Sequence, residues 1–424
     1  MKNHATLSLI CLFFISIFLF FSFNSSTITQ ESFIDDNNLS DTLLFNKDST
    51  YVVDRIIDLK GHRVVLPKNC SLVFRNGRLK NGTLYGNQTV IVGNKNIFEN
   101  IAIKGTWLIP EISTDLFIDF NKDNDLLNVF ALANPVIENQ IFINKGIYWV
   151  KATKDSPHII SIPNNTRVKI EGSIRLRPNN LDKYSIININ GGSNIKLYGN
   201  GEIKGDKKKH IGNKGEWGMC LRLTNSREIT ISGLNFLFAW GDCIYIGKGC
   251  KNININNCYL KGSRRQGISI TGGDSVIISD CIAKNIGGVP PGYAVDIEPN
   301  SGDTVSNVII SGIQVYNCTG GFALYTKKND LTRRAANVKV NDCKINTTKE
   351  FALSIKGGDS ISIIRCVINR HKGDVAVITE RNHDFVFQEN KVRTKNVVFN
   401  DTTFVKQANN KIIRGKLLPQ PKHN

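Results

Sequence analysis

The sequence predicts an all-β protein built as a parallel solenoid, and three features lead to that fold class. One pattern recurs: two apolar residues separated by one position, two more residues, then Cys, Leu or Ile at positions 234, 258, 281, 313, 343 and 366. A second short strand follows each copy, as in "DCIYIG", "QGISIT" and "YAVDIE". No helix intervenes, and Asn-Gly hairpin turns are scarce. Short strands repeated every 23 to 32 residues are typical of coils that stack on one another.

The first 28 residues have the character of an export signal. "MKNHATLSLICLFFISIFLFFSF" holds one lysine and then an unbroken apolar run from about Ala5 to Phe23, followed by the polar "NSSTITQES". This order is typical of a secretory signal. No small-x-small cleavage site is obvious and the run nearly spans a bilayer, so an uncleaved N-terminal anchor is the alternative. We therefore expect a secreted, periplasmic or cell-surface protein whose fold begins after residue 28.

The chain is strongly basic, with 54 Lys and Arg against 36 Asp and Glu and a net charge of +18. Such a charge favours a polyanionic partner, which could be nucleic acid, an anionic membrane or an acidic polysaccharide. A merely soluble basic surface is the alternative. Export and the solenoid fold argue against nucleic acid, and a membrane contact is expected only through the N-terminal segment. The sequence thus predicts an acidic polysaccharide as partner and does not indicate an oligomeric state.

Ten cysteines in an exported chain would ordinarily indicate disulfides. Four of them, however, end copies of the repeat: Cys258, Cys281, Cys343 and Cys366. One position of a parallel solenoid recurs about 4.8 Å higher on each coil, so these residues are expected to share an inward column with Leu and Ile. We predict that they are buried thiols rather than disulfide partners. No CxxC pair indicates a zinc site.

One segment departs from the strand pattern. "NKDNDLLNVFALANP" (121–135) has apolar residues near helical spacing, an acidic start and a proline stop, which predicts a short helix. The strand "IFINKGIYWV" follows it. A short helix followed by such a strand resembles the entry to a pectate-lyase-like β-helix, where the helix caps the solenoid.

From about residue 119 to 405 the chain resembles the right-handed parallel β-helix proteins of the pectin-lyase fold, which include polysaccharide lyases, polygalacturonase-like hydrolases and phage tailspikes. "GNGEIKGD" (199–206) is similar to the Gly-x-Gly-x-Ile-Asp-Gly stretch of polygalacturonases, with Lys204 in place of the Asp. "SRRQGISI" and "GYAVDIEPN" resemble stretches of exported β-helix proteins of gut Bacteroidetes and their phages. The resemblance implies a right-handed β-helix with a short N-terminal capping helix at 119–405, a β-rich start at 29–118 and a basic tail at 406–424.

The expected site lies on the second strand of each coil. When the inward apolar positions are matched, the outward residues form three columns. The first is small throughout, which would leave room for a ligand: Cys243, Gly267, Ala294, Ala323, Ala352 and Ala376. The second holds Tyr245, Ser269, Asp296, Tyr325, Ser354 and Ile378, and the third holds Gly247, Thr271, Glu298, Lys327, Lys356 and Glu380. The repeat lengthens here, and insertions in a solenoid become loops on one face, often the binding face.

Asp296 and Glu298, in "GYAVDIEPN", are the leading candidates. Two positions apart on a strand, their Cα atoms are about 6.6 Å apart and their side chains share a face. This spacing suits the carboxyl pair of an inverting glycosidase, calcium coordination, or a solvated acidic pair neutralised by Lys327. Asp242, in "WGDCIYIG", has a place that resembles that of a polygalacturonase aspartate, although the paired Asp-Asp and the Gly-His-Gly of that family are missing.

Six further residues complete the predicted site: Arg264, Arg265, Tyr245, Tyr325, Lys327 and Lys356. Arginine binds carboxylates and sulfates bidentately, so at least one of the two arginines is expected to contact substrate. The tyrosines would stack on sugars or act as a general acid or base. The lysines would neutralise a uronate or pair with nearby carboxylates. His210 and His371 are expected in solvent-exposed turns.

These residues support three functions. A polysaccharide lyase would neutralise a uronate with the arginines or lysines while Tyr325 or a lysine takes the adjacent proton. An inverting hydrolase would use Asp296 with Glu298 or Asp242. A non-catalytic glycan-binding surface protein would keep only the scaffold, which the lack of a complete family motif favours. The basic charge leads us to expect the lyase, with no required cofactor and with calcium as an option.

Overall fold

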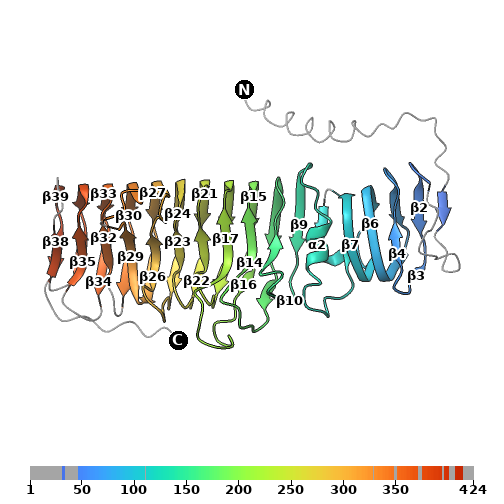
Figure 1. Cartoon of the computed structure of the whole chain (residues 1–424), viewed down its shortest axis with the longest axis horizontal. Coiled ribbons are helices and arrows are strands. Elements are labelled where there is room, and N and C mark those ends of the chain that lie inside the picture. The colour runs from blue at the N-terminus through green and yellow to red at the C-terminus, as the bar shows by residue number, and fades with distance from the viewer. Residues whose placement is uncertain are drawn as a thin grey trace, which may run out of the picture.

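Parallel strands stack coil upon coil into a long rod, with the low residue numbers at one end and the high numbers at the other (Figure 1). The structure is a computed structural model, and it describes residues 31–33, 46–109, 111–327, 329–347, 351–370, 375–393, 396–400 and 406–413. Each strand pairs in parallel with the strands one coil below and one coil above it. The predicted all-β parallel solenoid is confirmed.

Three parallel sheets form the rest of the rod, and from β9 onward the chain visits them in the same order on each coil. Sheet 1 has 12 strands: β8 (Glu111–Ser113), β9 (Asn139–Ile143), β12 (Thr166–Ile170), β15 (Ser193–Tyr198), β18 (Arg227–Ser232), β21 (Lys251–Asn256), β24 (Gly273–Ser279), β27 (Thr304–Ser311), β30 (Arg334–Asn341), β33 (Asp359–Ile364), β36 (His383–Gln388) and β39 (Lys406–Ala408). Sheet 2 has 11 strands: β10 (Ile147–Val150), β13 (Ser173–Leu176), β16 (Glu202–Lys204), β19 (Asn235–Leu237), β22 (Tyr259–Lys261), β25 (Ile282–Lys284), β28 (Gln314–Cys318), β31 (Lys344–Thr347), β34 (Val367–Arg370), β37 (Lys391–Arg393) and β40 (Lys411–Ile413). Sheet 3 has 10 strands: β11 (His158–Ser161), β14 (Lys183–Asn190), β17 (Trp217–Thr224), β20 (Ile244–Ile246), β23 (Ile268–Ile270), β26 (Tyr293–Ile297), β29 (Gly320–Tyr325), β32 (Leu353–Lys356), β35 (Val375–Glu380) and β38 (Asn396–Asn400).

A separate parallel sheet of seven strands precedes these three. Its strands are β1 (Glu31–Phe33), β2 (Thr50–Val53), β3 (Ile56–Asp58), β4 (Arg63–Val65), β5 (Ser71–Phe74), β6 (Arg78–Val92) and β7 (Phe98–Leu108). The long β6 pairs with β3, β4, β5 and β7 at different points along its length. The predicted division of the chain at residues 28, 118 and 405 stays a prediction.

The helix predicted within 121–135 is confirmed as α2 (Leu127–Ala131). It lies between β7 and β11 and buries Val129 and Phe130. The side chain of Asn128 accepts a hydrogen bond from the Ile103 amide at 3.0 Å, which ties the helix to β7. A short 3₁₀ helix, η3 (Thr114–Leu116), precedes it. The helix therefore packs at the junction between the seven-stranded sheet and the coils that are built from three sheets.

Aliphatic side chains fill the interior of the rod in columns. In β21, Ile253 and Ile255 are buried while Asn254 and Asn256 lie on the outer face. The inward column predicted from the repeat is confirmed, because all of its members are buried: Leu234, Cys258, Cys281, Ile313, Cys343 and Cys366. Every cysteine in the described residues is a free, buried thiol, as predicted for four of them. Burial of apolar surface, worth about 25 cal/mol per Å², holds successive coils together.

The residue before each member of that column has a positive φ. The φ angles are 74°, 51°, 53°, 64°, 57° and 54° at Gly233, Asn257, Asp280, Gly312, Asp342 and Arg365. Glycine, asparagine and aspartate enter this left-handed region more readily than other residues. One residue in this conformation turns the chain from sheet 1 to sheet 2. The turn explains why the repeat usually carries Gly, Asn or Asp directly before the apolar position.

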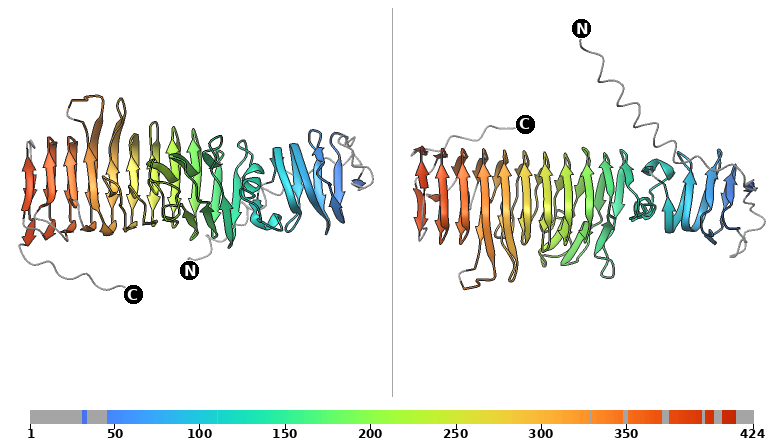
Figure 2. Two further views of the ribbon diagram at one scale, coloured as in Figure 1. Left: turned by 60° about the horizontal axis from the view of Figure 1, so that its bottom comes forward. Right: turned by 90° about the horizontal axis from the view of Figure 1, so that it is seen from above.

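The other two corners of the coil hold the insertions. Residues 205–216 and 285–292 connect sheet 2 to sheet 3, while 298–303 and the connection after β29 lead from sheet 3 to sheet 1. The connections after β26 and β29 project beyond the rest of the rod (Figure 2). Sheet 3 therefore lies between two rows of loops, as predicted for the strands that carry Asp296 and Tyr325.

The export segment lies outside the described residues, as do His371 and residues 414–424. Over the part of the chain that the structure describes, no helix has the length and apolar character to cross a bilayer. Secretion and N-terminal anchoring stay predictions.

Candidate functional site

Four predicted residues come together on sheet 3: Asp242, Arg265, Asp296 and Glu298. Asp242 lies just before β20, Arg265 lies in the connection that leads into β23, and the other two acids lie in β26 and directly after it. These three strands are consecutive neighbours in the sheet. Parallel stacking therefore brings residues about 25 to 55 positions apart in the sequence onto adjacent coils.

Gln266 joins the two aspartates. Its backbone amide donates to Asp242 Oδ1 at 3.0 Å, and its side-chain Nε2 donates to Asp296 Oδ2 at 2.7 Å. Its Oε1 accepts from the Tyr293 amide at 2.6 Å. Ser269 Oγ donates to Asp242 Oδ2 at 2.9 Å. Gln266 is fully buried, so these bonds fix the positions of both carboxyl groups.

The sequence analysis gave no role to Gln266, although a signal for it exists. Gln266 lies 24 positions after Asp242 and 30 positions before Asp296, which is one coil from each. An amide at that spacing can reach both acids. Glu216, in the 205–216 connection, was also missed, because a loop residue carries no periodicity that places it.

Both aspartates are buried, and their surroundings raise their pKa values to different extents. Asp242 is fully buried and Asp296 is 4% exposed, so this strand is not a solvated edge. Burial, with the charges of Glu298 and Asp242, raises the pKa of Asp296 to about 8, while Arg265 opposes the shift. Burial raises the pKa of Asp242 to about 6, against the charge of Arg265 and its hydrogen bonds. At neutral pH Asp296 is therefore mostly protonated and Asp242 mostly ionised.

Arg265 links the acids to the loop. Its Nη1 is 3.7 Å from Asp242 Oδ2, and its Nε is 3.5 Å from Glu216 Oε2. The Nε is buried and has no hydrogen-bond partner among the described residues. The guanidinium thus lies between the loop and the acids, where its charge lowers the pKa values of Asp242 and Asp296.

Arg264, in contrast, anchors the 205–216 connection. Its guanidinium donates to the carbonyl oxygens of Gly215 at 2.6 Å and Asn213 at 3.0 Å. The same group lies 3.9 Å from the centre of the Trp240 ring. His210 also stacks on Trp240, at 3.9 Å between ring centres, and its side chain is 1% exposed. The expectation of a solvent-exposed His210 is wrong, because the loop folds back over its own histidine.

The predicted columns are wrong at one strand, β29. The sequence alignment places Tyr325 beside Asp296, whereas Asp296 pairs with Ala323. The true register pairs Val295 with Phe322. The sequence alignment matched Ala323 to Ala294, which shifts β29 by two residues from its true register. Because side chains two positions apart share a face, the same residues point into the core in both alignments.

Tyr325 instead lies one coil above Glu298, at the end of β29. It pairs with Lys356, which in turn pairs with Glu380. Lys356 Nζ is 3.5 Å from Glu380 Oε2, so its carboxylate partner is Glu380. Tyr325 is 41% exposed, and Lys327 is exposed in the connection beyond the strand, outside the predicted column. These three side chains border the acid cluster without joining it.

The column of small residues does not form a groove. Cys243, Ala294 and Ala352 are fully buried. A Cβ at Gly267 would lie 2.3 Å from the Ala294 carbonyl oxygen, and one at Gly321 would lie 2.1 Å from that of Ala352. The neighbouring backbone thus occupies the space that the sequence analysis assigned to a ligand.

A cavity of about 230 Å³ lies on sheet 3, lined by residues of β11, β14, β17 and β20, and its uppermost strand, β20, is two coils below the strand of Asp296. Tyr245 lines it and pairs with Ser269, which pairs with Asp296, so cavity and acids lie along one column. Trp217, Arg222 and Lys183 are further parts of its wall. Aromatic and cationic side chains around one cavity suit an anionic sugar.

One histidine completes the cavity wall. His158 lines the same cavity, and burial, with the charges of Arg222 and Lys183, lowers its pKa. Its imidazole is therefore neutral at pH 7. Over the described residues, no three His, Cys, Asp or Glu side chains are arranged to hold a metal ion. Calcium binding by the acids stays a prediction.

Residues 220–413 match the family model described as "Right handed beta helix region". Two curated relatives come from Bacillus subtilis. The uncharacterized protein YclG is 28% identical over 186 residues, which is 37% of this chain and 32% of that protein. The SPbeta prophage-derived uncharacterized protein YorA is 25% identical over 202 residues, which is 40% of this chain and 34% of that protein. The chain spans about a third of the length of these relatives.

Solved structures resemble the chain at low identity. An exopolygalacturonase from Thermotoga maritima shares 12% identity and a TM-score of 0.48, covering 71% of this chain and 91% of its own. A tailspike of E. coli bacteriophage HK620 shares 13% identity and a TM-score of 0.47, covering 72% of this chain and 67% of its own. At such identities the likeness concerns the fold alone. The match over residues 220–413, together with the three parallel sheets, shows that this chain has the fold of a right-handed parallel β-helix.

Proposed function

We propose that this protein is a glycoside hydrolase that acts on an acidic polysaccharide bound along sheet 3. One observation carries the proposal: the buried carboxyl group of Asp296 is fixed by Gln266, and burial together with the charge of Glu298 raises its pKa to about 8. A carboxyl group that keeps its proton at neutral pH beside a second acid is characteristic of acid-base catalysis on glycosidic bonds. The fold itself hosts many chemistries, so the argument rests on the site.

Asp296 supplies the general acid. With a pKa of about 8 it holds its proton at neutral pH, ready to transfer to the glycosidic oxygen as the bond to the leaving sugar breaks. The hydrogen bond from Gln266 to Oδ2 leaves Oδ1 as the oxygen that carries the proton. Asp242 is fully buried and acts as a positioning residue, because its charge and its hydrogen bonds hold Arg265, Ser269 and Gln266.

Glu298 supplies the general base. It is half-buried directly after β26, on the same face as Asp296, with the two Cα atoms about 6.6 Å apart by strand geometry. A carboxyl separation of roughly 6.5–9.5 Å leaves room for a water molecule that attacks from the opposite face of the sugar. The expected outcome is inversion at the anomeric carbon.

The substrate extends from the acids into the 230 Å³ cavity. Tyr245 and Trp217 provide rings against which sugars pack, and Arg222 and Lys183 provide positive charge for a carboxylate. A chain of net charge +18 attracts such a substrate at long range.

The lyase expected from the sequence is the second candidate. The observation that favours it is the register of Tyr325 with Lys356 on adjacent coils beside Glu298, which gathers a phenol and an ammonium group at the edge of the site. A lyase would take the proton next to a uronate carboxylate there and leave an unsaturated sugar. Hydrolysis is favoured because a lyase that used these two groups would give no role to the buried carboxyl group of Asp296, whose pKa is raised to about 8.

Purified protein is incubated with a panel of uronate-containing and sulfated polysaccharides, with reducing ends and absorbance near 232 nm followed in parallel. The hydrolase yields reducing ends alone. A rise in both signals would replace it with the lyase. Neither signal across the panel would remove both enzymatic functions and leave glycan binding.

A further inference from the structure

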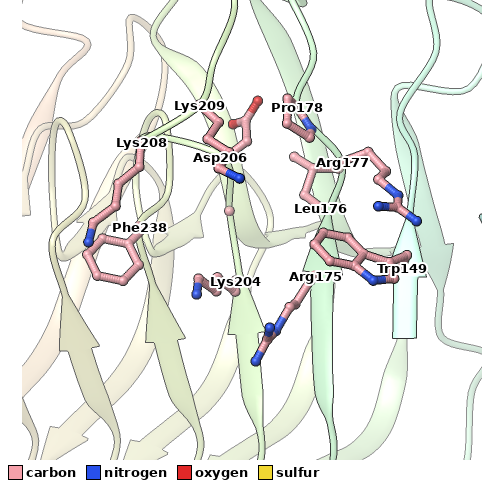
Figure 3. A pocket seen from close by; sticks show the side chains of 11 residues that line it. Trp149, Arg175, Leu176, Arg177, Pro178, Lys204, Asp206, Lys208, Lys209 and Phe238 are labelled. Atoms are coloured by element: carbon pink, nitrogen blue, oxygen red, sulfur yellow. The ribbon is translucent and has the colours of Figure 1, made fainter. Parts of the chain in front are cut away.

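A second cavity, of about 550 Å³, lies on sheet 2 (Figure 3). Its walls come from β10, β13, β16 and the residues after β19, which are four consecutive coils, and from the start of the 205–216 connection. The end of the same connection carries Glu216, which pairs with Arg265 of the acid cluster. One loop thus borders both sites.

Five cations line this cavity: Arg175, Arg177, Lys204, Lys208 and Lys209. The one acidic residue in the wall is Asp206, which is buried. Its Oδ2 accepts from the amide and the side chain of Asn179 and contacts His210 Nδ1 at 2.9 Å, and its Oδ1 accepts from the Tyr184 hydroxyl. The carboxylate is therefore used within the protein and does not neutralise the cavity.

Most of the cations have no strong partner. Arg177 Nε donates to Asp123 at 2.7 Å, and Arg175 Nη2 lies 3.8 Å from Glu202 Oε2. Within the described ranges, Lys204, Lys208 and Lys209 have no carboxylate oxygen within 4.0 Å. Three unpaired ammonium groups around one cavity repel each other, and a bound anion would remove that repulsion.

Two aromatic rings shape the wall. Arg177 lies 4.0 Å from the Trp149 ring centre, and Lys208 lies 4.3 Å from that of Phe238. Phe238 has a φ of 53°, a left-handed conformation that a bulky side chain rarely adopts. A Cβ at Gly262 would lie 2.8 Å from the Phe238 ring, so the glycine makes room for it. The chain holds this ring in the cavity wall at the cost of backbone strain.

We propose that this cavity binds a sulfated or carboxylated sugar of an acidic glycan, at a second site separate from the acid cluster. The volume lies within the range of small-ligand sites and fits a short stretch of sugar rather than a duplex. Single-stranded nucleic acids stack bases on open aromatic faces. In this cavity a cation already lies over each aromatic ring, so the ligand is recognised by positive charge rather than by stacking. The proposal does not depend on hydrolysis at sheet 3.

Binding is measured by titration calorimetry on the full chain with three probes: a sulfated heparin disaccharide, digalacturonate and inorganic sulfate. The test variant is Lys204→Gln/Lys208→Gln. The matched control, Lys339→Gln/Lys391→Gln, removes two exposed lysines from sheets 1 and 2 elsewhere on the rod. We expect binding of at least one disaccharide, weakened about tenfold or more in the test variant and unchanged in the control. Binding of the sulfated probe alone assigns a sulfate ester, and binding of both assigns either anion.

Asp296→Asn keeps the cavity intact and should bind the disaccharides as the wild type does, whatever its effect on hydrolysis. Circular dichroism melting shows that each variant is folded, and Lys209→Gln serves if the double variant is not. The absence of binding by both disaccharides, or equal binding by test and control variants, would overturn the proposal. So would a single-stranded oligonucleotide that binds more tightly than either sugar and depends on the same two lysines.

Discussion

At the scale of the residue, the buried carboxyl of Asp296 is the unusual feature of this molecule. A carboxyl group in a chain of net charge +18 would be expected to ionise easily, yet burial and two neighbouring acids hold its proton to a pKa of about 8. Arg265 is near enough to oppose that shift without reversing it. The protein therefore bears a cost in stability at neutral pH to keep this acid in place.

The first prediction concerns that cost. The carboxyl group of Asp296 has a pKa near 3.8 in the unfolded chain and about 8 in the folded protein. Between these two pH values the folded state holds a proton that the unfolded state has lost. The contribution of Asp296 to stability is thus greatest below pH 4 and falls as the pH rises to about 8, by on the order of 5 kcal/mol. Asp296→Asn removes this slope, which denaturant unfolding at pH 5 to 9 measures. A stability difference between wild type and variant that stays constant over this range would contradict the assignment.

The second prediction separates the two adjacent arginines. Arg264→Ala loses two charged hydrogen bonds and a ring contact, so we expect a loss of about 1–3 kcal/mol in unfolding free energy and faster proteolysis within 205–216. Arg265→Ala leaves those contacts in place and raises the carboxyl pKa values of the cluster, which carbon NMR of the side-chain carboxyls follows. Equal effects of both variants on the loop and on the carboxyl titration would show that the division of roles is wrong.

Residue types alone pointed to Asp296 and Glu298, because acids on the outward face of a solenoid strand are conspicuous, whereas Asp242 was predicted from a resemblance to polygalacturonases. Residue types did not identify Gln266, since a neutral amide before a strand is unremarkable until its two partners on adjacent coils are known. The burial of Asp296 was also beyond the sequence, because it depends on side chains from three coils and a loop.

At the scale of the element, close packing at the corner between sheets 2 and 3 decides which residues fit. Small residues recur there because the carbonyl of the next coil occupies the position of a side chain. The sequence showed that the residues at this corner are small, but it did not show that a backbone carbonyl is the cause.

The sequence also predicted the strands of sheets 1 and 3. Strands of sheet 2 such as β22 are only three residues long with one buried residue, which is too short for periodicity to reveal.

The third prediction tests that corner. Gly267→Ala places a Cβ 2.3 Å from a backbone oxygen, which only a shift of the coil can relieve, and should lower the unfolding free energy by roughly 1–3 kcal/mol or more. Gly146→Ala is the control, since its Cβ would meet the end of the Tyr148 side chain at 3.1 Å. We expect it to lose no more than about 1 kcal/mol in denaturant unfolding. Equal stability of the two variants would mean that the corner is open.

At the scale of the whole molecule, the rod is held by stacked apolar columns rather than by cross-links. The cysteines of the described coils are buried members of these columns, and the period of the repeat was enough to predict this for four of them. The parallel solenoid followed from the same repeat, and the resemblance to the pectin-lyase fold implied that it is a right-handed β-helix. The basic cavity on sheet 2 was not predicted, because its cations come from β13 and the residue directly after it, from β16, and from the 205–216 connection, with no common spacing.

The fourth prediction follows from these thiols. Reductant should leave the melting temperature of the protein unchanged, and a thiol reagent such as Ellman's should react slowly with the native protein and rapidly after denaturation. A melting temperature that falls in reductant would contradict the column of free thiols. Fast reaction of several native thiols would show instead that the coils open.

The central claim is that Asp296 gives a proton to a glycosidic oxygen. The most direct test compares reducing ends released from the best polysaccharide of the panel by wild type, Asp296→Asn and Asp359→Asn, the last an exposed acid on sheet 1. General acid catalysis contributes about 10²–10⁴-fold, so we expect Asp296→Asn to lose at least about a hundredfold in rate while Asp359→Asn keeps the wild-type rate. Equal rates for the two variants would contradict the claim.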